Sequence, residues 1–363
     1  MCRSLTVEKL VGIVFFATGI LALIYIEGKG LALQEMTSTI DEKLITIETR
    51  EQLADLDSAI VFLRDTLMPS TTHLADTLFK LGVLGALYLR RVAEIYEWVE
   101  EERSSTGSSD KSYSYYRSWE EYLINSDDFR HRKRHVNPAF KEFSSKLYMP
   151  DSLSIMGIGV DSAFVCELDD YDWLALPSRA RVAFVNAKAK VSGAHYYFGD
   201  RPDSPAVGDE RVRFEYLPRG LVSLIGFYDG IRLHGLKTAA GDWYYPMKRG
   251  AVAPEELHGQ FNTDILAFRF GRIFLLVFTL VGAGLLASQI GKREDLKPFI
   301  RSYLHPRPVR HGLLFGLGVY LLILSVMWFG NDMLHAVLIG LPGVAVLLTP
   351  LFLPQSRDGT SSS

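Results

Sequence analysis

Four stretches of this 363-residue chain carry no charged residue over the length that a membrane requires. They cover residues 10–26, 273–290, 312–329 and 336–354. A hydrocarbon core of about 30 Å needs roughly 17–25 consecutive apolar residues in a helix, because each residue advances the helix by about 1.5 Å. The sequence therefore predicts four transmembrane helices.

The first apolar stretch has two possible fates. Arg3 and Lys9 form a basic leader before it, as in a signal peptide. The stretch is longer than a usual signal core, however, and the Glu-Gly-Lys-Gly sequence at residues 27–30 offers no small-x-small cleavage site. We expect an uncleaved anchor, with a cleaved signal peptide as the alternative.

Basic residues near the apolar stretches predict the orientation. The connection 291–311 carries six Lys or Arg residues against two acidic ones, and the tails 1–9 and 355–363 are also short and contain basic residues. Because Lys and Arg close to a span resist translocation, we place all three segments and both termini in the cytoplasm. The short loop 330–334 and the large segment 27–264 then lie outside.

The charge of the large segment agrees with this orientation. The whole chain has a net charge of −3, and the residues outside 27–264 sum to +6, which leaves −9 for the segment itself. Cys2 and Cys166 would lie on opposite sides of the membrane and could not pair within one chain. The sequence contains no Asn-x-Ser/Thr glycosylation site, so the compartment stays open.

The segment 27–264 shows mostly strand periodicity. Residues 44–49 and 58–63 are short β-rich runs, and residues 211–216 alternate charged with apolar side chains. Residues 221–228 follow a Pro-Arg-Gly turn signal and could form a hairpin with the preceding strand. The expected fold class is a membrane protein with four transmembrane α-helices and a β-rich α+β extracytoplasmic domain.

Two aromatic runs surround a polar stretch early in this domain. Their regular spacing predicts a long β-hairpin held by cross-strand aromatic pairs, with a helix as the competing interpretation. The candidate structural aromatics are Tyr96, Trp98, Tyr113, Tyr115 and Trp119.

The motif search finds no catalytic, phosphate-binding or metal-binding pattern, so we expect neither an enzyme nor a cofactor. His131 and His135 are four residues apart, but the cations between and beside them would repel a metal ion. The cluster is either a solvated loop or a basic patch for lipid phosphates or a partner's carboxylates. Its members are Arg130, Arg132, Lys133 and Arg134.

Arg269 and Arg272 lie just outside the second span on its external side. Long basic side chains there reach the lipid headgroups, and the alternatives are a role inside the helix bundle or lipid binding. Because no span has an ionisable residue at mid-depth, we do not expect a channel or transporter. Ala283 and Ala287 place small residues four apart, a spacing that favours close helix packing.

Several of these segments together resemble the LUMA (transmembrane protein 43) family. The sequence Leu-Arg-Arg-Val-Ala-Glu-Ile-Tyr-Glu-Trp-Val-Glu at residues 89–100 is similar to the family signature. It is followed in order by similar segments at residues 113–119, 135–138, 195–198 and 205–214. The positions of the four spans also match.

This resemblance implies a membrane protein without a defining enzymatic activity. Eukaryotic members belong to the endoplasmic reticulum and inner nuclear membrane, and bacterial members would lie in the cytoplasmic membrane. We therefore expect a non-enzymatic scaffold that contacts membrane lipids, self-associates into a homo-oligomer and binds unidentified proteins, but not nucleic acid. The alternatives are a lipid-binding or lipid-acting module at the external surface and, third, a receptor, which the short cytoplasmic loops disfavour.

Overall fold

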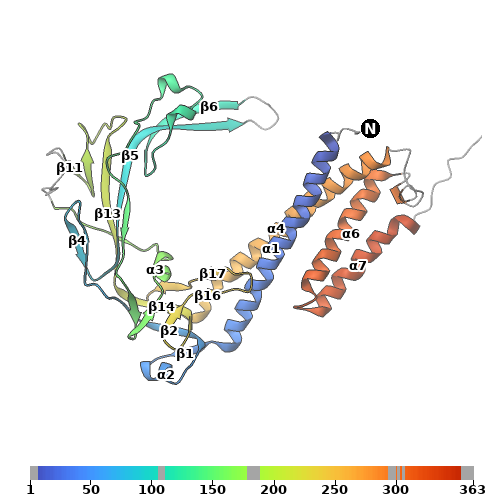
Figure 1. Ribbon diagram of the computed structural model, residues 1–363, viewed down its shortest axis with the longest axis horizontal. Coiled ribbons are helices and arrows are strands. Elements are labelled where there is room, and N and C mark those ends of the chain that lie inside the picture. The colour runs from blue at the N-terminus through green and yellow to red at the C-terminus, as the bar shows by residue number, and fades with distance from the viewer. Residues whose placement is uncertain are drawn as a thin grey trace, which may run out of the picture. The chain divides into compact units, whose positions relative to one another are not determined.

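The computed structural model describes residues 7–104, 111–177, 189–292, 300, 303–304 and 307–352. It divides into two compact units, one built around the apolar helices and one around β-sheets (Figure 1). The membrane unit comprises Met1–Glu42, Lys237–Trp243 and His258–Ser363, and the sheet unit comprises Lys43–Leu236 and Tyr244–Leu257.

The membrane unit contains four helices that are long and apolar enough to cross a membrane, as the sequence predicted. They are α1 (Val7–Lys43), α4 (Pro254–Gly291), α6 (Pro308–Trp328) and α7 (Met333–Phe352). The helices α1 and α4 have 37 and 38 residues and continue past their apolar stretches. Pro254 starts α4, at the end of a helix where its missing N–H costs no hydrogen bond.

Small residues let α4 and α6 approach closely. A Cβ atom added to Gly312 would lie 2.4 Å from Ala287 Cβ, and one added to Gly316 would lie 2.7 Å from Ala283 Cβ. The small-residue spacing on α4 therefore packs against glycines on α6, as small-xxx-small patterns do between membrane helices.

The first sheet of the sheet unit has seven strands in the order β1-β2-β8-β9-β15-β14-β18. Because β2 also pairs with β14, five of these strands close into a ring. The strands are β1 (Ile45–Ile47), β2 (Ala59–Pro69), β8 (Leu153–Ile155), β9 (Ile158–Val160), β14 (Gly220–Tyr228), β15 (Arg232–His234) and β18 (Met247–Arg249). Met156 and Gly157 both have positive φ and form the tight turn between β8 and β9.

The second sheet follows the path β11-β12-β13-β5-β6, with β10 beside β13 and β7 beside β5. Its strands are β5 (Ala86–Ser104), β6 (Lys111–Glu120), β7 (Lys146–Tyr148), β10 (Asp172–Trp173), β11 (Ala189–Ser192), β12 (His195–Phe198) and β13 (Glu210–Pro218). Ten residue pairs join β5 to β6 in antiparallel register. The predicted aromatic hairpin is therefore confirmed, and the competing helix is wrong.

The hairpin predicted between residues 211–216 and 221–228 is wrong. Both segments are strands, but β13 pairs with β5 in the second sheet, whereas β14 pairs with β2 in the first. The register of β13 shifts between Leu217 and Pro218, and the chain then passes from one sheet to the other. The turn signal marks this crossing.

Shorter elements complete the unit and its borders. They are α2 (Arg50–Ala54), α3 (Ala163–Cys166), the 3-10 turns η1 (Ser126–Asp128) and η2 (Arg132–Arg134), and the two-stranded pairs β3 (His73–Asp76) with β4 (Leu81–Leu84) and β16 (Leu236–Lys237) with β17 (Trp243–Tyr244).

Each sheet has its own apolar core. Leu63, Leu224 and Leu233 are fully buried in the core of the first sheet. In the second, Phe79 stacks on Tyr196 with ring centroids 5.7 Å apart and packs against other aromatic rings. This core covers one face of the second sheet.

Candidate functional site

The opposite face of the second sheet is polar and aromatic. Successive side chains of a strand point to opposite faces, so Val212 and Phe214 of β13 enter the core while Arg211 and Arg213 lie on the other side. Their partners across β5 are Glu94 and Val92. The charge alternation in the sequence thus becomes a continuous charged surface.

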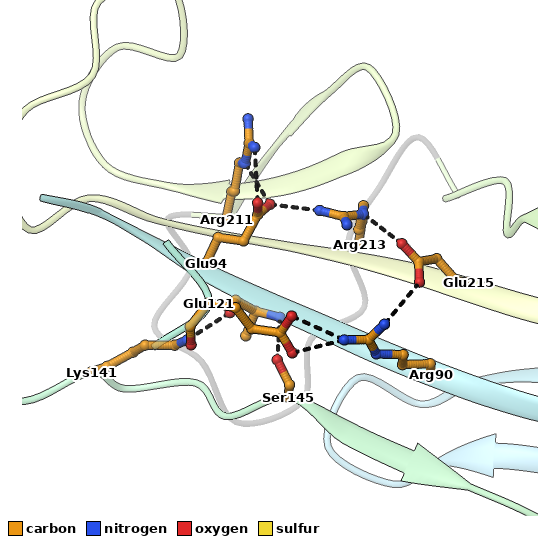
Figure 2. Close-up of polar contacts among 9 residues, drawn as sticks. Arg90, Glu94, Glu121, Lys141, Ser145, Arg211, Arg213 and Glu215 are labelled. Carbon is orange, nitrogen blue, oxygen red and sulfur yellow. Dashed lines mark hydrogen bonds and ion pairs between the residues drawn. The ribbon is translucent and has the colours of Figure 1, made fainter. Parts of the chain in front are cut away.

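Ion pairs connect this surface across neighbouring strands (Figure 2). Glu94 accepts hydrogen bonds from Arg211 Nε at 2.8 Å and Nη2 at 3.1 Å, and from Arg213 Nη1 at 2.7 Å. Arg213 Nε also donates to Glu215 at 2.9 Å, and Arg90 Nη1 lies 3.8 Å from the same carboxylate. We call these five residues the charged face.

Within the charged face, the two neighbouring guanidinium groups hold Glu94 in its ionised form. Burial by itself raises the pKa of Glu94, but hydrogen bonds and positive charge from Arg211 and Arg213 outweigh it and hold that pKa below its usual value. The two-armed contact from Arg211 also fixes the carboxylate's orientation.

The segment 121–145, which follows β6, forms hydrogen bonds with the backbone of β5 at the edge of the charged face. Lys141 Nζ donates to the backbone oxygen of Ala93 at 2.6 Å and also to that of Glu121. Ser145 Oγ accepts the Ala93 N–H at 3.1 Å, and Arg90 Nη2 donates to both oxygens of the Glu121 carboxylate at 3.0 and 3.1 Å (Figure 2). These side chains replace strand partners between the ends of β6 and β7.

Aromatic rings and cations continue the surface along the hairpin. Arg211 lies 4.5 Å from the Trp119 ring, and Trp119 packs on Tyr96 with centroids 5.1 Å apart. Arg117 then lies 5.9 Å from Tyr96 and 5.2 Å from Trp98. Cations over aromatic faces are attracted by the ring quadrupole.

The series ends at a histidine. Trp98 meets the His135 ring edge-on at 4.6 Å, and His135 stacks on Tyr115 at 3.8 Å with the rings only 3° from parallel. Tyr115 donates in turn to Glu100. We call the set described by these contacts the aromatic ladder; it comprises Tyr96, Trp98, Tyr115, Arg117, Trp119 and His135.

Most of the ladder is half-buried, while Arg117 is exposed. All five predicted structural aromatics lie on the hairpin, and four of them belong to the ladder. Tyr113 lies nearer the hairpin tip and donates to Glu102 at 3.2 Å.

Asn137 joins the hairpin to the segment behind it. Its Oδ1 accepts the Trp98 N–H at 2.8 Å, and its Nδ2 donates to the Trp98 oxygen at 2.9 Å and to the Ile124 oxygen at 3.2 Å. One amide therefore satisfies both backbone groups of Trp98, as a neighbouring strand would. In the sequence, Asn137 is only one residue of the segment 135–138 that resembles the family, and no local pattern predicts this role.

The basic cluster of residues 130–134 lies around η2, beside the end of the ladder. Arg132 pairs with Asp127 at 2.8 Å, with both side chains about three-fifths exposed. An exposed pair of this kind contributes little stability. Among the described residues, Lys133 and Arg134 have no carboxylate partner, so the cluster offers free positive charge to solvent.

The structure separates the two arginines near the second span. Arg272 Nε lies 2.6 Å from Oε2 of Glu27, a carboxylate with no exposed surface, and the guanidinium lies 5.8 Å from the Trp328 ring. Trp328 Nε1 donates to the same carboxylate, and Tyr320 donates to the Arg272 backbone oxygen at 2.6 Å. Arg272 thus faces the interior of the bundle.

Arg269 is exposed and lines a shallow groove of about 370 Å³ between α1 and α4. Gln34, Thr37, Ser38 and Asn262 supply polar side chains to this groove, and Asp41 supplies a negative one. From the sequence, the two arginines are predicted to share one role at the lipid headgroups. The contact of Glu27 with Arg272 is not predictable, because nothing local links residues so far apart in the chain.

Other titratable groups occupy structural positions. Burial raises the pKa of Glu97 to about 7, and this carboxylate accepts the Ile124 N–H at 3.0 Å. His234 sits between Asp161 and Asp229 at 3.1 and 2.9 Å, with no Ser or Cys among these contacts. Within the described parts of the chain, no three His, Cys, Asp or Glu side chains are grouped so that they could hold a metal ion.

Comparisons with a family model and with individual proteins agree on the relatives of this chain. The family model described as Transmembrane protein 43 matches residues 95–330. Transmembrane protein 43 of Homo sapiens is 25% identical over 292 residues, covering 76% of this chain and 72% of its own length. The Mus musculus protein is 24% identical with 76% and 71% coverage, and the Drosophila melanogaster homolog is 26% identical with 64% and 63% coverage.

No solved structure matches the chain. The resemblance seen in the sequence is confirmed by the family model, which covers most of the chain, including the aromatic hairpin and the second and third apolar helices. The chain belongs to the Transmembrane protein 43 family of integral, multi-pass membrane proteins.

Proposed function

We propose that the protein is a non-enzymatic membrane scaffold whose external domain binds its own copies or other proteins through the aromatic ladder. The observation that carries this proposal is the composition of the ladder. Trp, Tyr and Arg dominate the energetic centres of protein interfaces. Here they are concentrated on the one face of the second sheet that its apolar core does not cover.

The rigidity of the ladder supports the same function. Each ring contacts a neighbouring ring or cation, and the charged face and Asn137 fix the strands beneath it. A partner would therefore find these side chains already ordered. Binding a preorganised surface avoids part of the entropy cost of immobilising side chains.

The proposed placement follows the positive-inside assignment. We propose that both termini and the connection 291–311 are cytoplasmic and that the sheet unit lies in the periplasm, the lumen or outside the cell. Cys2 and part of the basic connection lie outside the described residues, so this proposal rests on charge in the sequence.

Charge reversal at Arg117 tests the proposal. Arg117→Glu removes both cation–π contacts at an exposed position, so the fold should persist. Arg103→Glu is the matched control, because Arg103 lies on the same hairpin and its 68% exposed side chain pairs, among the described residues, with Glu101 alone. The measurement is chemical cross-linking in native membranes, with the masses of the homo-oligomer and of hetero-complexes resolved.

The expected result is at least a tenfold loss of one cross-linked species in Arg117→Glu alone, as for an interface hot spot of about 2 kcal/mol. Circular dichroism should remain that of the wild type in both variants. If both variants retain all cross-linked species, the ladder is not the binding surface.

The groove at Arg269 favours a second candidate function, lipid binding at the external membrane surface. A guanidinium binds a phosphate through two parallel hydrogen bonds, and Asn and Ser side chains can add more. Arg269→Lys keeps the charge and removes the two-armed geometry. Because Arg272 is paired with Glu27, changing Arg269 alone tests the groove without disturbing that ion pair, which a change of both arginines would break.

The scaffold proposal expects Arg269→Lys protein to keep its wild-type co-purifying phospholipids and oligomer size. Selective loss of one lipid species in native mass spectrometry, with folding intact, would favour the lipid-binding function instead. The basic cluster of residues 130–134 would then be the next position to change.

A further inference from the structure

A partly open cavity of about 470 Å³ lies in the membrane unit, at the end that carries the basic connection, and several of its lining side chains are exposed on the surface of the bundle. It is bordered by all four long helices and by the short helical segment at Tyr303 and Leu304. Its lining is almost wholly apolar and includes Phe16, Ile290, Phe315 and Leu351. The volume lies within the range of small-molecule sites.

The packing of α4 against α6 explains why this space stays open. Ala283, Ala287 and Gly312 all line the cavity, and the same residues make the close approach between the two helices. Side chains this small bring the backbones together but leave nothing to fill the volume beside them. A cavity without polar groups does not hold water well, so a hydrocarbon chain suits it.

Three exposed basic residues lie at this end of the bundle, where Glu8 also accepts a hydrogen bond from Gln289. Lys292, Arg307 and Arg310 are exposed, and none has a carboxylate partner among the described residues. A Cβ atom added to Gly291 would lie 2.8 Å from Pro308 Cβ, so the ends of α4 and α6 meet there and bring Lys292 and Arg307 to one rim.

We propose that this cavity binds one acyl chain of an anionic phospholipid, whose phosphate is held by Lys292, Arg307 and Arg310. The basic rim selects a phospholipid with net negative charge over a zwitterionic one. The site lies at the opposite end of the bundle from the Arg269 groove and does not depend on the scaffold proposal. With the proposed orientation it would face the cytoplasmic leaflet, whose surface is negative.

The test uses the full-length protein in nanodiscs of equal parts phosphatidylglycerol and phosphatidylcholine. Each lipid is supplied in turn with a photoreactive acyl chain, and labelled positions are read by peptide mass spectrometry. Wild-type protein should be labelled around the cavity, with the phosphatidylglycerol probe labelling more strongly than the phosphatidylcholine probe. Labelling at lipid-exposed positions such as Leu338 should show no preference.

Two kinds of variant address the two halves of the site. Arg307→Gln with Arg310→Gln changes exposed residues and should reduce the preference for phosphatidylglycerol about fivefold for each charge removed. Leu348→Trp should narrow the cavity and reduce labelling there, whereas Leu338→Trp, on the same helix outside the cavity, should not.

Equal labelling of the cavity by both probes, unchanged by the charge variants, would mean that bulk lipid fills a surface groove and would overturn the proposal. Labelling of the cavity that is the same in Leu348→Trp as in the wild type would do the same. A preference that is lost in Arg269→Gln but kept in Arg307→Gln with Arg310→Gln would place the anionic lipid at the other end of the bundle.

Discussion

Removal of Arg272 should destabilise the membrane unit strongly because it strands a buried carboxylate. Glu27 has no exposed surface, and its two oxygens face Arg272 Nε at 2.6 Å and the Trp328 indole N–H. Arg272→Met keeps the apolar stem and removes the charge. Glu27 is then left with a single neutral donor in a water-poor environment.

The expected cost is about 3–5 kcal/mol, the usual range when one partner of a buried ion pair is removed. The double variant Glu27→Leu with Arg272→Met should recover most of this loss, because no charge remains to be desolvated. Trp328→Phe removes one hydrogen bond to a charged group and should cost about 1.5–3 kcal/mol. The interaction between Glu27 and Arg272 is therefore measured by how far the free-energy loss of the double variant falls below the sum of the losses of its two single changes.

The assay is equilibrium unfolding of the purified full-length protein in mixed micelles of increasing dodecyl sulfate content, followed by Trp fluorescence and far-ultraviolet circular dichroism. Because Trp328→Phe removes one of the fluorescent Trp residues, its unfolding curve is fitted with its own fluorescence baseline. If Arg272→Met is within 1 kcal/mol of wild type, or if the double variant is as unstable as the single one, the pair is not buried as the structure has it.

Thiol labelling tests the topology: Cys2 should react only after permeabilisation, whereas the exposed Cys166 should react from outside, and labelling of Cys2 in intact cells would overturn the orientation. Trp98→Ala should lower the free energy of unfolding by about 2 kcal/mol, roughly half the cost of emptying a fully buried Trp site, because the ring is half-buried; denaturant unfolding measures it, and a neutral effect would mean that the ring packs against nothing. Since burial raises the pKa of Glu97 from 4.5 to about 7, its contribution to stability is complete below about pH 4.5 and is lost, by roughly 3 kcal/mol, as the pH rises to about 7. Glu97→Gln should remove that slope from unfolding measured against pH, and an unchanged slope would contradict the assignment. Gly316→Leu should overpack the contact between α4 and α6 and cost about 1–3 kcal/mol in micelle unfolding, whereas an unchanged midpoint would mean that these helices do not meet there.

Local sequence patterns predicted which segments form helices and strands better than they predicted which strands pair with each other. The aromatic hairpin was predictable because both strands and the polar stretch between them are adjacent in the chain. The predicted hairpin of β13 and β14 failed although both strands were recognised, because a turn signal does not state which sheet the next strand joins. That choice is made by β5 and β2, more than one hundred residues earlier.

For the candidate site, too, the sequence predicted the elements but not the contacts between them. The alternation of Arg211 and Arg213 with apolar residues predicted a half-buried strand, but not that Glu94 would receive both guanidinium groups. The aromatic residues were identified as structural, yet the His135 and Arg117 contacts that complete the ladder come from outside the predicted set.

The sequence by itself determined the four apolar helices, because an uncharged helix of that length has no other stable environment than a membrane. It also determined that the intervening segment is rich in strands, through the two-residue period of its side chains. Only the tertiary structure decided that Glu27 meets Arg272, that a cavity stays open beside the contact of α4 and α6, and that the rings of one hairpin join the charges of another strand. Those contacts depend on which distant segments pack together, and the free energy that selects them is distributed over the whole core rather than encoded in any local run of residues.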